Sequence, residues 1–214
     1  MPAPSSASTP VPDGLSPRAA TQGPEPAPSR GSPRWGTDVA LARAAGLGDR
    51  DAFDVIAQRH GPALLRFARR MVRDPDEAQD VVQEALVAAW LSMARWDGRS
   101  ALSTWLFGIT ANKARDVRRR RRPAPVDPEV LMRHEVDVVE DRAGSTPEEA
   151  LFRSALAEAL TDLPQRQRAA WLLTQVEGLT QAEAAVALRM TPDAVRGQLG
   201  RARQSLITKL EDWR

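Results

Sequence analysis

The side chains best suited to chemistry lie near the middle of the chain, where a loop with one aromatic residue precedes a strongly basic segment. The loop carries Arg95, Trp96 and Arg99, and the segment after it ends in five consecutive arginines at 118–122. Basic residues at the end of a helix can compensate the helix dipole, but five in a row exceed what that requires. An arginine run beside an aromatic loop is the composition that grips a phosphate backbone next to unstacked bases. This segment therefore predicts nucleic-acid binding in preference to a solvated cationic tail.

Tryptophans in and around this segment have two possible roles. Trp90 and Trp105 fall on apolar stripes of helical spacing and are expected in the core. Trp96 lies in the loop beside glycine and arginine, so packing in the core and stacking on a base both remain open for it.

A second polar cluster lies in residues 178–207, whose spacing is typical of a helix-turn-helix. A helix over 181–189 is followed by a turn through Met190 and Thr191, and a second helix begins at Pro192. Apolar residues occupy one side of both helices. Four polar side chains are left for the other faces of the second helix: Arg196, Gln198, Arg201 and Arg203. Arginine pairs with guanine edges and phosphates and glutamine with adenine edges, so the pattern predicts a helix in the DNA major groove. The alternative is a helical hairpin with a solvated basic face.

Two carboxylates one helical turn apart, Asp80 and Glu84, form a third candidate site, with Gln83 beside them. Paired carboxylates can perform acid–base catalysis, yet no further acid or histidine is placed to complete a catalytic or metal site. The chain has no cysteine and only 2 histidines, which excludes thiolate chemistry and sulfur-ligated zinc. We therefore interpret this face as a polar protein-docking surface, and we expect no catalytic residue, no metal and no cofactor.

Helix-capping signals place these clusters on helices. Asp74, Thr146 and Thr180 are N-cap candidates; proline follows the first two, and the third opens a capping box. We also expect Ser100 to cap the helix that ends in the arginine run. Apolar residues follow each signal at three- and four-residue spacing, and no segment alternates as a strand does. The sequence therefore predicts an all-α protein.

Composition divides the 214 residues into four parts. Residues 1–35 are rich in proline, serine and alanine and cannot bury enough apolar surface to offset chain entropy, so we expect disorder there. Residues 36–122 and 146–214 are expected to form two small helical domains. Residues 123–145, with six acidic and two basic side chains, are expected to be a flexible acidic linker. Neither an apolar run of membrane-spanning length nor a secretory signal is visible, so no membrane insertion and a cytoplasmic location are expected.

Three sequence motifs, in this order along the chain, carry a resemblance to a known family. They are DEAQDVVQEALVAAW, ALSTWLFGITANKARD and, after the acidic linker, ALTDLPQRQRAAWLL with the helix-turn-helix behind it. Over residues 38–210 the chain resembles the bacterial RNA polymerase sigma factors of the extracytoplasmic-function group.

The resemblance implies that residues 36–122 correspond to the family's region 2 and residues 146–214 to its region 4. Region 2 would dock on the β′ clamp helices of core RNA polymerase and would read and melt the −10 promoter element. Region 4 would read the −35 element and meet the β flap. The residues matching polymerase docking are Asp80, Gln83 and Glu84. Those matching −10 recognition are Arg95, Trp96, Arg99, Asn112, Lys113, Arg115, Arg118 and Arg119. Those matching −35 recognition are Thr191, Arg196, Gln198, Arg201 and Arg203, and Leu156, Leu160 and Leu163 match the neighbourhood of the flap.

Two further expectations follow from the resemblance. The acidic linker would thread a cationic channel that RNA normally occupies, which suits its net negative charge. Family members are commonly held inactive by an anti-sigma protein, so such a partner is expected here.

The sequence thus predicts a promoter-specificity subunit, a transcription initiation factor and not an enzyme. One alternative is a stand-alone helix-turn-helix regulator, which would bind duplex DNA as a dimer without polymerase. That alternative leaves the face around Asp80 and Glu84 unexplained. A second alternative is a metal-dependent nuclease, which would need a compact ligand set that the sequence does not show.

Overall fold

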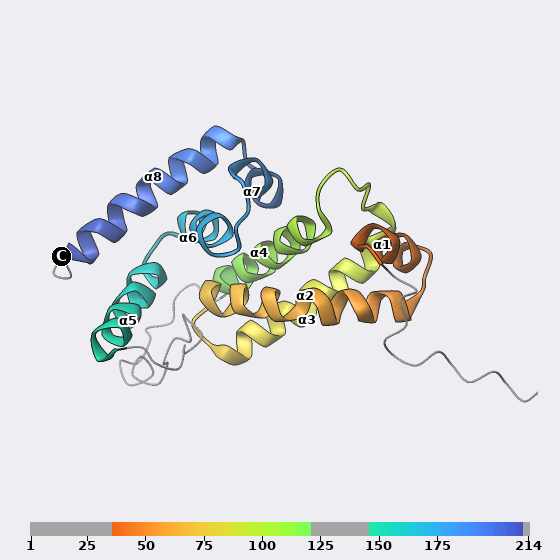
Figure 1. Ribbon diagram of the computed structural model, residues 1–214, viewed down its shortest axis with the longest axis horizontal. Coiled ribbons are helices and arrows are strands. Elements are labelled where there is room, and N and C mark those ends of the chain that lie inside the picture. The colour runs from red at the N-terminus through yellow and green to blue at the C-terminus, as the bar shows by residue number, and fades with distance from the viewer. Residues whose placement is uncertain (1–35, 121–145, 212–214) are drawn as a thin grey trace, which may run out of the picture. The chain divides into compact units, whose positions relative to one another are not determined.

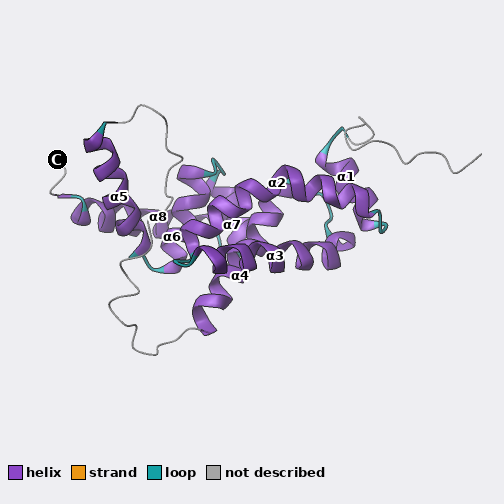
Figure 2. Cartoon of the chain, turned by 90° about the horizontal axis from the view of Figure 1, so that it is seen from below, coloured by secondary structure: helices purple, strands orange, loops and turns teal. Residues whose placement is uncertain are grey.

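The computed structural model describes residues 36–120 and 146–211, and every regular element in these two ranges is a helix (Figures 1 and 2). The elements are α1 (Asp38–Gly46), α2 (Arg50–Met71), α3 (Pro75–Ser92), a 3₁₀ turn η1 (Met93–Arg95), α4 (Leu102–Arg120), α5 (Pro147–Thr161), α6 (Gln165–Trp171), a π-helical turn η3 (Leu172–Val176), α7 (Gln181–Leu188) and α8 (Pro192–Lys209). The all-α prediction is confirmed for these residues. The segments expected to be disordered or flexible, 1–35 and 123–145, lie outside the described residues.

Most helices begin where the sequence signals predict. The Asp74 carboxylate accepts a hydrogen bond from the backbone N–H of Asp76 at 2.9 Å and so caps α3. Thr146 and Thr180 each form a complete capping box at the start of α5 and α7. The Thr191 hydroxyl accepts from the N–H of Ala194 at 3.2 Å at the start of α8. These caps satisfy backbone donors that have no partner inside the helix.

Two boundaries differ from the sequence prediction. Helix α4 begins at Leu102, and its first helical hydrogen bond runs from Trp105 N to the carbonyl of Ala101, so the predicted cap at Ser100 is wrong by one residue. Helix α7 ends at Leu188 rather than 189, because Arg189 adopts a left-handed conformation with φ of 52°. A left-handed residue at this position ends a helix and turns the chain sharply.

Helices α1 to α4 pack around a core of large apolar side chains. Fully buried members from three of these helices are Leu41, Ile56, Phe67 and Leu106. Trp90 and Trp105 pack against this core and are partly buried, as predicted. The ring of Trp90 meets that of Phe53 edge-on with centroids 5.2 Å apart, a favourable arrangement for aromatic pairs.

The same core continues into the helices that follow the linker. Buried residues of η3, α7 and α8 belong to it, among them Leu172, Ala187 and Val195. A smaller cluster joins α5 to α8 through Leu160 and Leu206. The sequence predicts two domains joined by a tether; it did not predict that helices from both sides of the linker share one core.

Candidate nucleic-acid interface

Helix α4 presents part of the expected −10 surface on the face that also carries Gly108. Asn112 and Arg115 follow this glycine at four- and seven-residue intervals, and residues so spaced align along one side of an α-helix. Asn112 is half-buried and Arg115 is exposed. Their polar ends therefore lie at a boundary between protein and solvent, as a nucleic-acid contact requires.

Two other basic residues of α4, Lys113 and Arg119, form ion pairs, and the side chain of a third lies outside the described residues. The Lys113 ammonium donates a hydrogen bond to the Glu84 carboxylate on α3 at 3.1 Å. Arg119 is exposed and pairs with Asp116, one turn earlier, at 3.6 Å. The side chain of Arg118 lies outside the described residues. The expected −10 residues of α4 therefore do not form a single continuous face.

The loop before α4 separates its aromatic residue from its basic residues. Arg95 and Arg99 are exposed, and the Arg99 guanidinium lies 3.2 Å from the Asp97 carboxylate. Trp96 packs against the core and is partly buried, including its indole nitrogen. Of the two roles left open for Trp96, this placement favours packing beneath the loop, with the arginines above it.

The expected docking face on α3 combines exposed polar and exposed apolar side chains. Asp80 and Gln83 are exposed, whereas Glu84 is shared with Lys113. Sequence reasoning missed Val87 and Leu91, whose exposed fractions are 59% and 76%. Their signal was present: both are large apolar residues that stand outside the buried stripe of α3. An exposed apolar pair next to carboxylates is typical of a protein-binding surface.

The helix-turn-helix is built as the sequence predicts. Ala184, Ala185, Val195 and Leu199 are buried and join α7 to α8. The left-handed Arg189 leads through Met190 to the cap residue Thr191, and these three residues form the turn. Arg189 is exposed and adds a cation at the turn that sequence reasoning had placed inside the helix.

The polar residues of α8 differ in their surroundings. Arg196, Arg201 and Arg203 are exposed, and Gln198 is partly buried. The Arg196 guanidinium donates to the Asp193 carboxylate at 2.8 Å. The Arg201 guanidinium lies back over Gly197, 3.6 Å from where a Cβ atom would stand. The predicted −35 surface is therefore largely exposed, with the Arg201 guanidinium lying along its own helix beside Gly197.

A groove of about 410 Å³ lies between α4 and the helix-turn-helix. Its walls include Asn112 and Arg115 from α4, Leu188 and Arg189 from the end of α7, and Arg166 from α6. The lining contains three arginines and no carboxylate. Residues expected at the −10 element and a cation at the helix-turn-helix thus face the same groove.

Among the described residues, the pKa values of Asp162, Glu177 and Glu183 are shifted, each for a different physical reason. Hydrogen bonds from the Thr180 hydroxyl and backbone N–H lower the pKa of Glu183. A hydrogen bond from Lys209 lowers the pKa of Asp162. Burial raises the pKa of Glu177 in spite of the neighbouring Arg70. These carboxyl groups cap a helix or form contacts between helices. None of the three residues was predicted to bind DNA.

The leucines expected near the β flap are mostly buried. Leu160 and Leu163 are 5% and 1% exposed and belong to the core between α5 and α8. Their side chains are therefore not available to a partner, and Leu156 is only partly buried against the same cluster. The exposed apolar residues of α5 are instead Leu151 and Phe152.

The described residues contain no group of three histidine, aspartate or glutamate side chains that could hold a metal ion. None of their helices combines the length and apolar character that crossing a membrane requires. In residues 36–120 and 146–211 the regular elements are all helices, and they include a basic helix and a helix-turn-helix. These features place the protein in the class of DNA-binding proteins.

Comparisons with known proteins specify the family. The model of sigma-70 region 2 matches residues 56–123, and that of sigma-70 region 4 matches residues 153–206. The RNA polymerase sigma factor CnrH of Cupriavidus metallidurans is 35% identical over 180 residues, covering 81% of this chain and 94% of its own. The sigma factor NccH of Alcaligenes xylosoxydans xylosoxydans is 33% identical over 176 residues, covering 81% and 95%. The chain belongs to the sigma-70 family of RNA polymerase sigma factors, in the extracytoplasmic-function group.

Solved structures agree with this assignment. CnrH in complex with the cytosolic domain of CnrY matches with a TM-score of 0.60 at 32% identity, over 80% of this chain and 96% of that one. The sigma factor RpoE in complex with the anti-sigma factor NepR from Bartonella quintana matches with a TM-score of 0.60 at 26% identity, over 74% and 96%.

Proposed function

We propose that this chain binds core RNA polymerase through α3 and directs it to promoters by reading the −10 element with α4 and the −35 element with α8. The observation that carries the proposal is the presence, in family order, of an exposed docking face, a basic helix and a helix-turn-helix with exposed arginines. Residues 36–122 then act as region 2 and residues 146–214 as region 4, joined by the acidic linker 123–145.

Within region 2, the roles divide according to exposure and pairing. Asp80 and Gln83, which are exposed, contact the β′ clamp helices, and Val87 and Leu91 extend that contact with apolar surface. Glu84 contributes by fixing α3 to α4 through Lys113. This division makes Asp80 a cleaner probe of docking than Glu84, whose substitution would also disturb α4.

The −10 element is read by α4 and its preceding loop. Exposed Arg95, Arg99 and Arg115 bind phosphates, and Asn112 supplies a polar contact to bases. Trp96 positions the loop from below. Unstacking bases costs a few kcal/mol per step, which these contacts must offset during melting.

The −35 element is read by α8. Thr191 and Arg203 bind the DNA phosphate backbone at the two ends of the contact. Arg196, Gln198 and Arg201 are the candidates for contacting base edges. The Thr191 residue also caps the helix, and a helix N-terminus favours a phosphate.

An anti-sigma protein is the proposed regulatory partner. The similar sigma factors CnrH and RpoE were solved with CnrY and with the anti-sigma factor NepR. By this similarity we expect a protein that binds this chain and keeps it from polymerase. The chain would act in the cytoplasm, where core RNA polymerase works.

The experiment that tests the function is binding of the chain to purified bacterial core RNA polymerase, followed by transcription from a promoter library. Tight binding and a new promoter preference are expected. Asp80→Lys is expected to weaken polymerase binding at least tenfold, because it reverses an exposed charge on the docking face. Asp54→Lys, the same change at an exposed site on α2, serves as the control. Equal affinity of both variants for core polymerase would remove α3 from the docking site.

A further inference from the structure

The groove between α4 and the helix-turn-helix is strongly cationic. Arg115 of α4, Arg166 of α6 and Arg189 at the end of α7 line it, and all three are exposed. Within the ranges that the structure describes, none of these arginines pairs with a carboxylate, and the lining contains no acidic side chain. Several guanidinium groups around one groove attract an anion with more than one negative charge.

The buried part of the same lining is apolar. Met71, Ala111 and Ala169 are buried, and Leu188 and Met190 are partly buried. An organic ligand gains affinity by covering such a surface, whereas a small inorganic anion does not. The volume of about 410 Å³ falls within the range of roughly 300–1,000 Å³ that is typical of pockets for small organic molecules. The groove therefore suits an organic molecule with anionic groups attached.

Two side-chain amides complete the polar lining of the groove. Asn112 is half-buried, and the Nε2 atom of Gln165 is buried without a hydrogen-bond partner among the described residues. Buried donors in folded proteins nearly always have a partner, because a donor without one costs free energy. A ligand acceptor in the groove would supply that partner. Asparagine and glutamine amides are well suited to the edges of nucleobases, adenine in particular.

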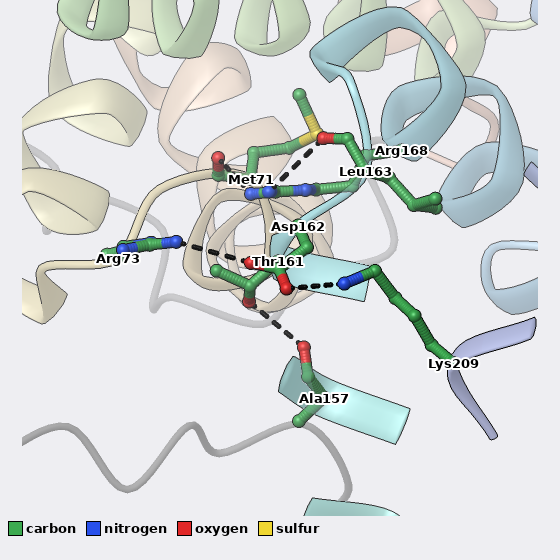
Figure 3. A network of polar contacts seen from close by, with 8 residues as sticks. All are labelled: Met71, Arg73, Ala157, Thr161, Asp162, Leu163, Arg168 and Lys209. Carbon is green, nitrogen blue, oxygen red and sulfur yellow. Dashed lines mark hydrogen bonds and ion pairs between the residues drawn. The ribbon is translucent and has the colours of Figure 1, made fainter. Parts of the chain in front are cut away.

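The wall that α6 supplies is fixed in position by a buried guanidinium (Figure 3). Arg168 is 1% exposed and donates hydrogen bonds to the carbonyl oxygens of Met71 at 3.1 Å and Leu163 at 3.5 Å. These bonds hold α6, and with it Gln165 and Arg166, against the end of α2. A site that is formed before its ligand arrives loses less free energy on binding.

The wall that α4 supplies is fixed by a close contact with α7. A Cβ atom added to Gly108 would stand 2.8 Å from the carbonyl oxygen of Ala187 and 3.2 Å from its Cα atom. Real Cβ atoms do not come this near to a backbone oxygen, so the two helices pack at this distance only because residue 108 is glycine. Asn112 and Arg115 follow Gly108 on the same face of α4, beside this contact.

We propose that this groove binds a nucleotide. Arg115, Arg166 and Arg189 hold its phosphate groups, because guanidinium groups pair bidentately with phosphate oxygens. The base lies on the apolar part of the lining, where the amides of Asn112 and Gln165 contact its edge. The site goes beyond the proposed function, since Gln165, Arg166 and Arg189 have no assigned role in reading a promoter.

The test is isothermal titration calorimetry of the full-length chain with ADP, in the absence of polymerase and DNA. We expect one ADP per chain, an affinity that falls as salt is added, and a higher melting temperature in the presence of ADP. GDP, CDP and UDP show which base is preferred, and ADP should bind most tightly because of the two amides. Pyrophosphate, which carries the phosphate groups without a base, should bind about tenfold more weakly than ADP or worse.

Two variants separate ligand binding from folding. Arg189 has φ of 52°, a left-handed conformation that glycine adopts without strain. Arg189→Gly should therefore raise the melting temperature of the chain alone while it weakens ADP binding about tenfold. Gln165→Leu removes an amide whose Nε2 atom has no partner among the described residues, so it should weaken ADP binding without destabilising the chain alone.

A third variant, Arg166→Ala, has a matched control in Arg43→Ala. Both arginines are exposed, but Arg43 lies on α1 and does not line the groove. Arg166→Ala should weaken ADP binding about tenfold. Arg43→Ala removes the same charge from the chain and should leave the affinity for ADP unchanged.

Three results would overturn the proposal. The first is that none of the four nucleotides binds a chain that circular dichroism shows to be folded. The second is equal affinity for ADP and pyrophosphate, which would mean an inorganic anion site that does not contact a base. The third is an equal loss of affinity in Arg43→Ala and Arg166→Ala, which would mean a general attraction of anions to a basic protein. None of these results depends on polymerase binding, so they are distinguishable from a failure of the proposed function.

Discussion

Individual arginines on α8 are held differently, and that difference decides which one is the better reporter of DNA recognition. Arg196 is paired with Asp193, which is itself on the exposed first turn. The Arg201 guanidinium lies beside Gly197 and pairs with no carboxylate among the described residues, so it can extend toward a base edge without breaking an ion pair.

For this reason Arg201→Ala is expected to cost about 1–3 kcal/mol of promoter binding, the worth of a good contact to a base. The measurement is polymerase binding to a preferred promoter and to the same promoter with a scrambled −35 element. Gln204→Ala, an exposed change on the same helix, is the control. Unchanged discrimination between the two DNAs in the Arg201 variant would contradict the assignment.

Asp162 provides a residue-scale prediction about acid stability. Its carboxylate accepts a hydrogen bond from Lys209 at 2.7 Å, which lowers its pKa. A carboxyl whose pKa is lowered by folding contributes stability above its ordinary value of 3.8, and the contribution is lost as the pH falls through the lowered pKa. Because both partners are nearly half-exposed, the contribution is at most about 1 kcal/mol.

We therefore expect Asp162→Asn to lower the urea midpoint at pH 7, and we expect the difference from the parent to shrink as the pH is taken below 3.8. Asp54→Asn, on an exposed part of α2, should show no such difference. A deficit in the Asp162 variant that stays constant with pH would point to packing rather than to the charge.

At the scale of single elements, α8 carries two glycines in its interior, Gly197 and Gly200, and their surroundings differ. A Cβ atom at Gly197 would make an ordinary contact with the Arg201 guanidinium at 3.6 Å, whereas a Cβ at Gly200 would meet nothing within 4 Å. Glycine inside a helix costs about 0.5–1 kcal/mol relative to alanine. Gly200 thus weakens the recognition helix without a packing reason inside the protein.

Gly200→Ala is accordingly expected to raise stability by about 0.5–1 kcal/mol. Gly178→Ala should do the opposite, because Gly178 has φ of +73°, which side-chain-bearing residues adopt only with strain. Thermal unfolding of the two variants measures both effects. A lower melting temperature for Gly200→Ala would contradict the expected open space. Should that variant be more stable but bind the promoter less well, the backbone at Gly200 lies against DNA.

For the molecule as a whole, one core extends across both sides of the linker. Leu41 of α1 and Val195 of α8 belong to the same cluster of buried residues. Helices that share a core lose their packing together, which produces cooperative unfolding. The family architecture of two modules is thereby combined with a single packed unit.

The whole-chain prediction is a single unfolding transition in urea, with the same midpoint by far-ultraviolet circular dichroism and by tryptophan fluorescence. Gly108→Ala, whose added Cβ atom would stand 2.8 Å from the carbonyl oxygen of Ala187 on α7, should broaden or split the transition. Gly61→Ala, with nothing within 4 Å of its added Cβ atom, should not. Two separate transitions in the parent chain would mean that the shared core contributes little to stability.

Local features of the fold could be predicted from the sequence because their causes act over a few residues. The caps at Asp74, Thr146 and Thr180, the helix-turn-helix and the all-α class all follow from neighbouring side chains and backbone donors. The family motifs could also be found in the sequence, because each consists of residues that are close together along the chain. The Ser100 cap was predicted wrongly. The residue at which α4 begins depends on how the preceding loop, including Trp96, packs against the core.

The long-range contacts of Gly108 and Arg168 could not be predicted in this way. Gly108 reads in sequence as a minor weakness in a helix, and only the position of Ala187 shows that the glycine is required. Arg168 reads as one more cation, yet it is buried against a carbonyl 97 residues earlier in the chain. The sequence by itself determined the helices, their polar faces and the family, through short-range hydrogen bonding and apolar spacing. The tertiary structure alone decided which of those faces are covered, because steric contact and desolvation depend on segments that only folding brings together.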